Sequence, residues 1–217
     1  MTSWASYAGA RIVSGSVLIP LYGAMTADVH FADVTAVPSV ASTLTVGDLI
    51  MAGTAVRTAG FAGARSARLV GGAGGWRRDV LARAYDVGVT VSMVLGDAAT
   101  EVGELVAVTT DRSLGQWVRE PGPASRVLAM LAGSSWWINA AGVTQVGTPR
   151  SALPITSPFV VMSRDGASGL VQIATDTFAD WMPGRTFVAP TISTPLTVKM
   201  VRHHFDREGI ARTEVLT

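Results

Sequence analysis

The sequence predicts a mainly β fold of the α+β class. We expect an antiparallel, tube-like β-barrel or sandwich formed by the N- and C-terminal segments, with an inserted middle region of two helices and a hairpin. Three observations lead to this prediction: apolar and polar residues alternate near both chain ends, Gly and Asp interrupt the alternation, and helical spacing of apolar residues occurs only in the middle. Hydrophobic residues make up 48% of the 217 residues and charged residues only 15%, so the chain can bury a sizeable core.

The first β segment is expected to span residues 1–85. Apolar residues alternate with polar ones through 10–33 and again through 42–72, and β-branched residues are frequent in both runs. The sequence VGDL at 46–49 predicts a tight turn, because Gly accepts positive φ and Asp bonds its own backbone. We therefore expect an antiparallel meander in which each strand buries one face.

The middle region is expected to span residues 86–150 and to open with a helix. Apolar residues recur there three and four positions apart, which places them on one helical stripe: Val91, Val94, Leu95, Ala98 and Val102. Thr90 or Ser92 can cap the start of this helix, and Gly103 can end it.

A second, shorter helix and a hairpin complete the middle region. The sequence PGP at 121–123 favours a helix start, and Gly133 favours its end. Between them, Val127, Leu128 and Leu131 form the apolar face. The sequence SWWINAAGVTQVG at 135–147 is typical of a hairpin whose turn is NAAG.

The second β segment is expected to span residues 151–217. Turn signals occur in RDGASG at 164–169, in the Pro-Gly pair at 183–184, which is typical of a type II turn, and in DREG at 206–209. The last of these predicts a closing hairpin. Because strands flank the middle region on both sides, we expect the two β segments to close a single barrel around it.

The glycine-rich stretch GGAGGW at 71–76 suggests a phosphate-binding loop, but its flanks do not fit one. A P-loop needs Lys followed by Ser or Thr where this chain has Trp76, Arg77 and Arg78, and the dinucleotide fingerprint fails at its third glycine. We interpret the stretch as a turn that joins two strands, with positive φ at Gly74 and Gly75 and with Trp76 covering its base.

Candidate metal ligands are sparse. The chain has three histidines, and His203 and His204 point to opposite faces if they lie on a strand. Together with Asp206 they therefore make a poor metal site, and only His30 is left to add a ligand. We expect no metal ligands and no cofactor-binding residues, and we interpret these histidines as polar residues of a hairpin.

Candidate catalytic residues are equally sparse. No G-x-S-x-G sequence is present, so a serine nucleophile of that type is not indicated. Asp97, Glu101 and Glu104 are the acid–base candidates, but helical spacing places Asp97 and Glu101 one turn apart on the polar side of the first helix. A solvated helix face explains them, so we expect no catalytic residues and no enzyme activity.

Six tryptophans are many for a chain of this length. Trp136 and Trp137 begin a predicted strand, so one ring is expected in the core and the other outside. Because subunit interfaces favour Trp, we interpret the outward ring as a subunit contact. A sugar platform is the alternative, but nothing beside the ring supplies its usual carboxylates and amides.

The overall charge argues against two classes of partner. The net charge of +1 indicates no specific nucleic-acid binding and no attraction to an anionic membrane.

The sequence also argues against disulfides and membrane insertion. There is no Cys, which excludes disulfides and thiolate sites. No targeting segment is indicated at the N-terminus, and the apolar run 17–21 is too short to span a bilayer as a helix. We expect no stable membrane insertion.

The order of these motifs resembles the baseplate hub, or tail tip, proteins of tailed bacteriophages with siphophage-like or Mu-like tails, which are related to tail-tube proteins. The resemblance covers most of residues 15–217. It rests on STLTVGDLIMAG…GGAGGWRRDVLARAY at 42–85, GVTVSMVLGDAATEVGE at 88–104, SSWWINAAGVTQVG at 134–147 and VRHHFDREGIARTEVLT at 201–217. It is a likeness of glycine, tryptophan and apolar spacing, without a catalytic signature.

The resemblance implies a structural virion protein, assembled in the host bacterial cytoplasm and located in the phage tail. Such a hub caps or extends the tail tube as a closed ring, here a homotrimer. Its partners would be a tail-tube or distal tail protein, the tip or spike, and the tape-measure protein, and DNA would pass through its lumen. The chain is shorter than the larger hubs, which hold two tube-like domains.

Three alternatives remain. A tail-associated cell-wall-degrading enzyme would need the acid–base pair that the sequence does not supply. A receptor-binding tail component is the second. A membrane-spanning barrel would fit the positive mean hydropathy, but it requires evenly spaced strands with aromatic girdles, which the helical middle interrupts.

Overall fold

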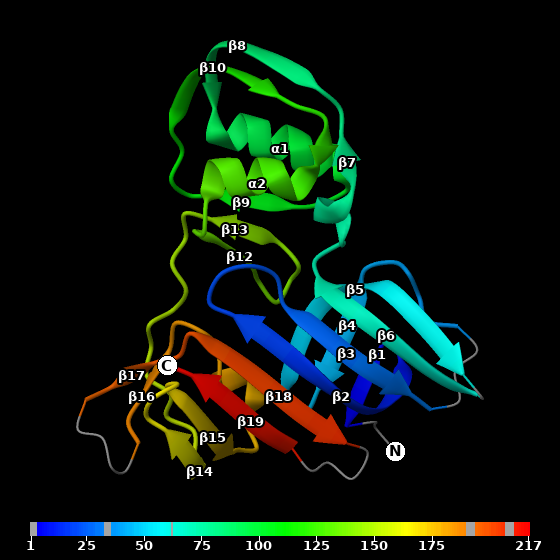
Figure 1. The fold of residues 1–217 in the computed structure, drawn as a ribbon, viewed down its shortest axis with the longest axis vertical. Coiled ribbons are helices and arrows are strands. Elements are labelled where there is room, and N and C mark those ends of the chain that lie inside the picture. Colours follow the sequence, from blue (N-terminus) through cyan, green and yellow to red (C-terminus); the bar gives the residue numbers. More distant parts are fainter. Residues whose placement is uncertain (1–3, 33–35, 62, 190–193, 207–210) are drawn as a thin grey trace.

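The computed structural model describes residues 4–32, 36–61, 63–189, 194–206 and 211–217. Three bodies follow the three segments of the sequence: a barrel, a middle body that stands above it, and a second β body beside the barrel (Figure 1). The fold class predicted from the sequence is confirmed, since strands dominate and form a closed barrel of six antiparallel strands.

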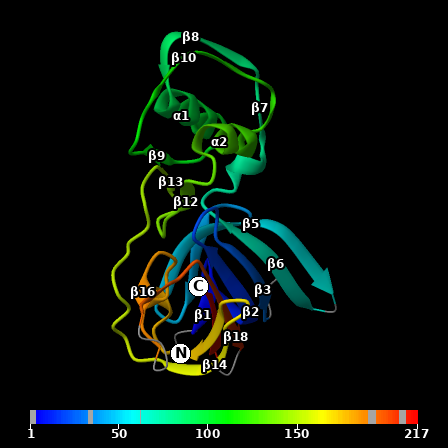
Figure 2. The ribbon, with the colours of Figure 1, turned by 60° about the vertical axis from the view of Figure 1, so that its left-hand side comes forward.

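The six barrel strands all come from the first β segment. They are β1 (Ala5–Tyr7), β2 (Ala10–Pro20), β3 (Thr26–Phe31), β4 (Ser42–Val46), β5 (Leu49–Phe61) and β6 (Ala64–Gly71). In the sheet their order is β1-β4-β5-β6-β3-β2, and pairing of β1 with β2 closes the barrel (Figure 2). The predicted meander is correct within β1, β2 and β3 and within β4, β5 and β6. It is wrong at the step from β3 to β4, because β3 pairs with β6.

The barrel core follows from alternation along each strand. In β3, Ala27, Val29 and Phe31 are buried, whereas Asp28 and His30 face outwards. The predicted turn at 46–49 is confirmed, with a φ of 58° at Gly47 between β4 and β5. Because each strand places its apolar residues on the inner side, the barrel has a filled core and a polar outer face.

The second β body extends the barrel sheet. It contains β14 (Val160–Asp165), β15 (Leu170–Ala174), β16 (Thr186–Phe187), β17 (Leu196–Thr197), β18 (Met200–Asp206), β19 (Ala211–Leu216) and the 3-10 turn η2 (Phe178–Asp180). β18 pairs with β2, so one sheet of ten strands runs from the barrel to β14. The C-terminal strands therefore continue the sheet, and closure occurs within the first segment.

Two of the predicted C-terminal turns are confirmed. The turn at 164–169 joins β14 to β15, and Gly184 has a φ of 93°, with Arg185 N–H donating to the carbonyl of Met182, as in a type II turn. β18 and β19 form the predicted closing hairpin, although most of its turn, 207–210, lies outside the described residues. A second core fills this body around the fully buried Trp181.

The middle body packs two helices between short sheets, with β8 and β10 on one side and β9, β13 and β12 on the other (Figure 1). Its elements are η1 (Gly75–Arg77), β7 (Asp79–Val80), β8 (Arg83–Thr90), α1 (Val91–Val102), β9 (Val106–Val108), β10 (Ser113–Arg119), β11 (Gly122–Pro123), α2 (Ala124–Ala132), β12 (Trp136–Ile138) and β13 (Thr144–Val146). The predicted caps of the first helix are confirmed: Thr90 accepts from Met93 N–H, and Gly103 is left-handed at a φ of 75°. Neither described helix is long and apolar enough to cross a bilayer.

Several hydrogen bonds fasten the middle body to the barrel. Ala52 N–H donates to the carbonyl of Ala140 at 2.7 Å, and Gly23 N–H donates to that of Trp136 at 2.7 Å. The sequence-based boundary at residue 85 lies within β8, and Trp76 already packs in the core of the middle body. The middle body thus begins at η1, directly after the glycine-rich stretch.

Candidate functional site

The glycine-rich stretch 71–75 links the barrel to the middle body. The chain leaves β6 at Gly71, adopts positive φ at Gly72 (79°) and Gly74 (72°), and enters η1. The interpretation as a turn is correct for these glycines, but the positive φ expected at Gly75 is wrong. Trp76 is buried as expected, and its indole Nε1 donates to the hydroxyl of Thr144 at 2.9 Å.

This turn does hold a carboxyl group, and that group belongs to Glu104 of the same chain. Glu104 Oε1 accepts from Gly75 N–H at 2.6 Å, and Oε2 accepts from Ala73 N–H at 3.3 Å. Burial raises the pKa of Glu104, while hydrogen bonds from the backbone of Gly75, Ala73 and Trp76 oppose the rise. The predicted solvated position is wrong for Glu104, which is 5% exposed, because the chain turns inwards after Gly103.

The other two acid–base candidates are engaged in ion pairs. Asp97 lies 2.8 Å from the guanidinium of Arg83, and Glu101 pairs with the buried Arg119. Glu101 also accepts from Leu81 N–H at 2.6 Å, and this bond is the main reason why its pKa is lowered. These contacts bind β7, β8 and β10 to α1, so we assign the carboxylates a structural role.

The histidines separate to opposite faces of β18, as predicted. His203 is completely buried, 5.0 Å from the ring of Phe178, and its Nδ1 shares a hydrogen bond with Thr213. Burial, with a smaller effect of His204, lowers the pKa of His203 to about 3. The predicted hairpin position is confirmed for both histidines, since β18 pairs with β19, although His203 is buried within it. No three potential metal ligands gather among the residues that the structure describes.

The expected division of the tryptophan pair between core and surface is not seen, since both residues are half-buried. Trp136 packs against the core of the middle body. The Trp137 ring lies under the guanidinium of Arg150, at 4.3 Å, and Arg150 also donates to the carbonyls of Leu21 and Pro20. Burial lowers the pKa of Arg150 to about 10. The ring expected at a subunit contact is thus partly covered by Arg150 of its own chain, which also bonds to the end of β2 in the barrel.

The outer face of the ten-stranded sheet is polar. One row of directly opposed residues crosses six strands: Arg57, Arg68, Asp28, Ser16, His204 and Arg212. Asp28 and Arg68 form an ion pair at 3.2 Å, and Glu214 lies within 4 Å of three cationic or titratable side chains of β18 and β19. Acidic and basic side chains are therefore both present on this surface.

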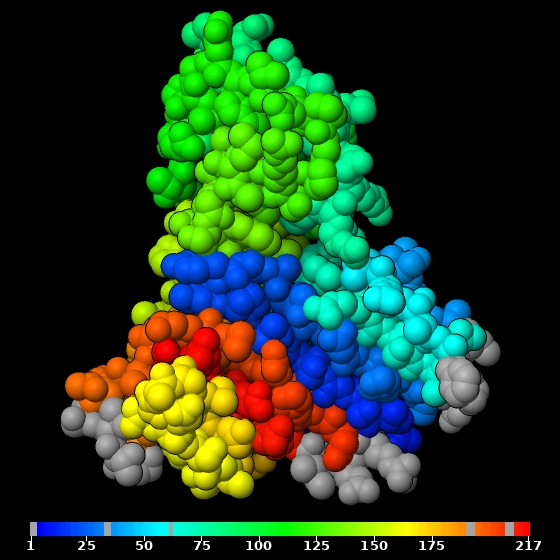
Figure 3. Space-filling model, viewed as in Figure 1, coloured from blue at the N-terminus to red at the C-terminus, as the bar shows by residue number. Residues whose placement is uncertain are grey.

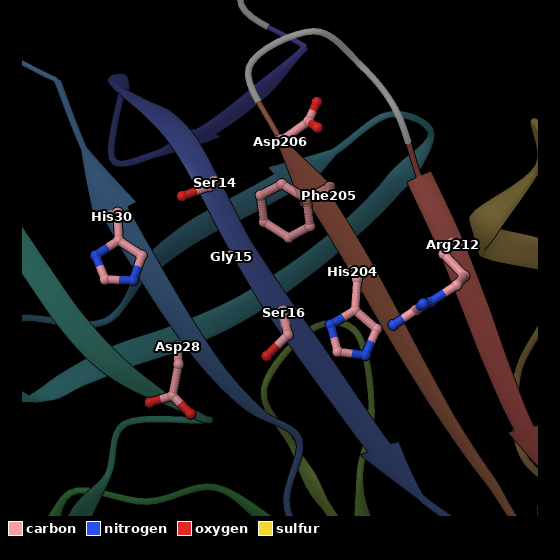
Figure 4. Close-up of a pocket in the computed structure, with 9 residues that line it drawn as sticks. All are labelled: Ser14, Gly15, Ser16, Asp28, His30, His204, Phe205, Asp206 and Arg212. Atoms are coloured by element: carbon pink, nitrogen blue, oxygen red, sulfur yellow. The ribbon is translucent and has the colours of Figure 1, made fainter.

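A shallow trough of about 590 Å³ lies on this polar face (Figure 4). Ser14 and Ser16 form part of its floor on β2, with His30 on one side and His204 on the other. Gly15 separates the two serines, and a Cβ at this position would lie 2.6 Å from the carbonyl oxygen of Asp28. The small residue therefore allows β2 and β3 to approach closely.

The last strand of the large sheet, β14, presents exposed apolar side chains. Val160 is 62% exposed and Met162 is 66% exposed. Met162 lies where the β14–β15 register shifts, so a bulge interrupts the strand there. The surface of the second β body also exposes Leu153 and Val188. Figure 3 shows strands from both chain ends forming one continuous surface below the middle body.

No family model matches the sequence, and no curated protein matches it. Solved structures do match. A type VI secretion component, the E. coli c3393 protein, which is described as structurally similar to the T4 bacteriophage tail proteins gp27 and gp5, aligns with a TM-score of 0.67 at 10% identity over 99% of this chain and 74% of its own.

Two tail proteins match over almost their whole length. The tail protein from Neisseria meningitidis MC58 has a TM-score of 0.64 at 14% identity, covering 94% of this chain and 91% of its own. The 43 kDa tail protein of prophage MuSo2 from Shewanella oneidensis has a TM-score of 0.67 at 10% identity, covering 94% and 93%. The chain therefore has the fold of bacteriophage tail proteins, which is the fold that its motif order suggested.

Proposed function

We propose that the protein is a structural component of a phage tail, and specifically a baseplate hub that caps or extends the tail tube and joins it to the tip or spike. The observation that carries this proposal is the fold, a closed barrel whose sheet continues into a second β body, shared over most of the chain with tail proteins. The low charge and the exposed apolar side chains support a position within an assembly.

The proposed assembly is a closed ring of identical copies, a homotrimer, in the virion tail. A tail-tube or distal tail protein would bind one side, and the tip or spike and tape-measure proteins the other. We assign the polar outer face of the sheet to the channel, because a conduit for DNA or protein needs a wettable wall. The serines, paired charges and shallow trough of this face support that assignment.

The ring should be visible as a trimer in native mass spectrometry or light scattering. Raising the salt concentration should weaken it little, because apolar contacts rather than exposed ion pairs would hold it. Met162→Glu on β14 should reduce assembly, whereas Val87→Glu, at an 81% exposed position of the middle body, serves as the matched control. A subunit that stays monomeric even when the tube-end partner is added would disprove the ring.

We also expect the purified protein to lack hydrolase activity on peptidoglycan. The motivation is that Asp97, Glu101 and Glu104 are each engaged by an arginine or by backbone N–H groups. Release of soluble sugar or peptide from purified cell walls measures this. Turnover that disappears in Asp97→Asn or Glu101→Gln would instead favour the cell-wall-degrading alternative.

A further inference from the structure

The 3-10 turn η2 crosses between the barrel and the second β body. Its first residue, Phe178, packs in the barrel core, whereas Trp181, directly after the turn, packs in the core of the second β body. Among the described residues, no backbone hydrogen bond joins η2 to another element. The carboxylate of Asp48 in the β4–β5 turn holds it instead, since it accepts from Phe178 N–H at 2.8 Å and from Ala179 N–H at 3.3 Å.

The Phe178 ring fixes η2 on the barrel by packing. It lies against Gly47, where a Cβ would come within 2.9 Å of Cδ2 of the ring, and it meets the Trp4 ring edge-on, with centroids 5.7 Å apart. It also meets the imidazole of His203, with centroids 5.0 Å apart. Phe178 is therefore the part of η2 that covers His203.

His203 lies on β18 where the two cores meet. Val201, two positions before it, packs in the core of the second β body, and Phe205, two positions after it, packs in the barrel core. The His203 side chain is completely buried. Its Nδ1 shares a hydrogen bond with Thr213 at 2.9 Å, and its Nε2 has no hydrogen-bond partner among the described residues. A second proton on this ring would therefore bring a charge into the contact between the two cores.

The acidic groups around His203 are not placed to neutralise that charge. Among the described residues, His203 forms no ion pair. Asp48 is bound to the backbone of η2, and Asp180 of η2 is paired with an arginine. Glu214 and His204 lie on the outer face of the sheet, opposite to His203. A protonated His203 can therefore be stabilised only if the ring reaches water.

η2 is the neighbour of His203 that can leave at the lowest cost. β18 pairs with β2 through seven opposed residues and with β19 through six. Opening either ladder would break many backbone hydrogen bonds. Release of η2 breaks the two bonds to Asp48 and the packing of the Phe178 ring.

Acid favours release of η2. The pKa of His203 is lowered to about 3 while η2 covers the ring, mainly by burial and to a smaller extent by His204. A histidine in water ordinarily titrates near pH 6.5. Because the uncovered ring binds a proton at a higher pH than the covered ring, the open form gains population as the pH falls from 6.5 towards 3.

We propose that His203 and η2 form an acid-sensitive latch, in which protonation of His203 is coupled to release of η2 from the barrel while β18 stays paired with β2 and β19. Release takes Phe178 out of the barrel core and exposes the imidazole to water. The latch thus loosens a contact between the barrel and the second β body before the protein unfolds. This inference does not depend on the ring or on the role as a hub.

Native-state amide hydrogen exchange tests the latch, with rates corrected for the intrinsic effect of pH. The protection of the Phe178 and Ala179 amides should fall about tenfold per pH unit between about pH 6 and pH 4. Dilute urea should barely change their exchange, because a local opening exposes little surface. The amide of Val29 in the central strand β3 should exchange faster as urea is added. Equal urea dependence of the Phe178 and Val29 amides would show that η2 opens only with global unfolding and would overturn the proposal.

Two variants identify the group that takes up the proton. In His203→Gln, the protection of the η2 amides should no longer depend on pH, because glutamine has no proton to gain. In Asp48→Asn, protection should be lower at every pH, because a charge-assisted acceptor is lost, but it should keep its change of about tenfold per pH unit. His30→Gln, on the polar outer face, is the control and should leave the pH dependence as it is. A pH dependence that persists in His203→Gln, or that disappears in Asp48→Asn, would assign the effect to another group and contradict the latch.

Discussion

Gly75→Val should lower the free energy of unfolding by about 3 kcal/mol or more, because Gly75 is buried and tightly packed. A Cβ at Gly75 would lie 2.1 Å from the carbonyl oxygen of Val102 and 3.0 Å from Cγ of Glu104. The carbonyl belongs to the last turn of α1 and cannot move without disturbing the helix end. The substitution therefore separates the glycine turn from the carboxylate that it holds.

Thermal unfolding with and without nucleotides measures this effect. Gly96→Ala is the matched control, because nothing lies within 4 Å of a Cβ there and alanine favours a helix, so stability should rise slightly. Nucleotides should change neither melting temperature, because the turn already binds Glu104. A stable Gly75→Val variant that has lost nucleotide protection seen in the parent protein would restore the phosphate-loop interpretation.

Acidification should destabilise the protein through His203 by about 3–5 kcal/mol between pH 6.5 and 3. Because the pKa of His203 in the folded protein is lowered to about 3, the unfolded chain binds a proton at a higher pH than the folded one. The stability is complete above pH 6.5 and falls as the pH decreases towards 3, by about 1.4 kcal/mol per pH unit.

Urea unfolding across this pH range, compared between the parent protein and His203→Gln, isolates the contribution of this residue. The glutamine should flatten the acid limb, since it has no proton to gain. His30→Gln, on the polar outer face, is the control. The difference in acid limb between proteins with and without His203 should be the same when this control substitution is also present. Identical acid limbs for the parent protein and His203→Gln would show that His203 is not the group responsible.

The first helix illustrates what the sequence alone could predict. Its apolar stripe, its threonine cap and its glycine end all lie within fifteen residues, and each acts through neighbours on the same helix. The structure confirms all three. The second helix and the hairpin at 135–147 were predictable for the same reason, because their signals are local.

The position of Glu104 shows the limit of such reasoning. Its partners Gly75 and Ala73 precede it by 29 and 31 residues, so no local spacing reveals the contact. The burial of His203 likewise depends on Phe178 and Thr213, on other elements. The order of strands was also beyond reach, since β18 pairs with β2 across most of the chain. A glycine turn followed at a distance by a glutamate is too common to signal such a contact.

The closed barrel has a further consequence for how copies can join. Since β1 pairs with β2, β14 is the only free edge of the ten-stranded sheet among the described strands. The sheet can therefore pair with another copy through one edge only, and pairing of two β14 strands would give a twofold dimer with no free edge left. In a ring of three, each copy contacts two neighbours, so β14 of one copy would have to bind a different surface of the next copy. Such a contact is directional, so the proposed ring would have two unlike faces.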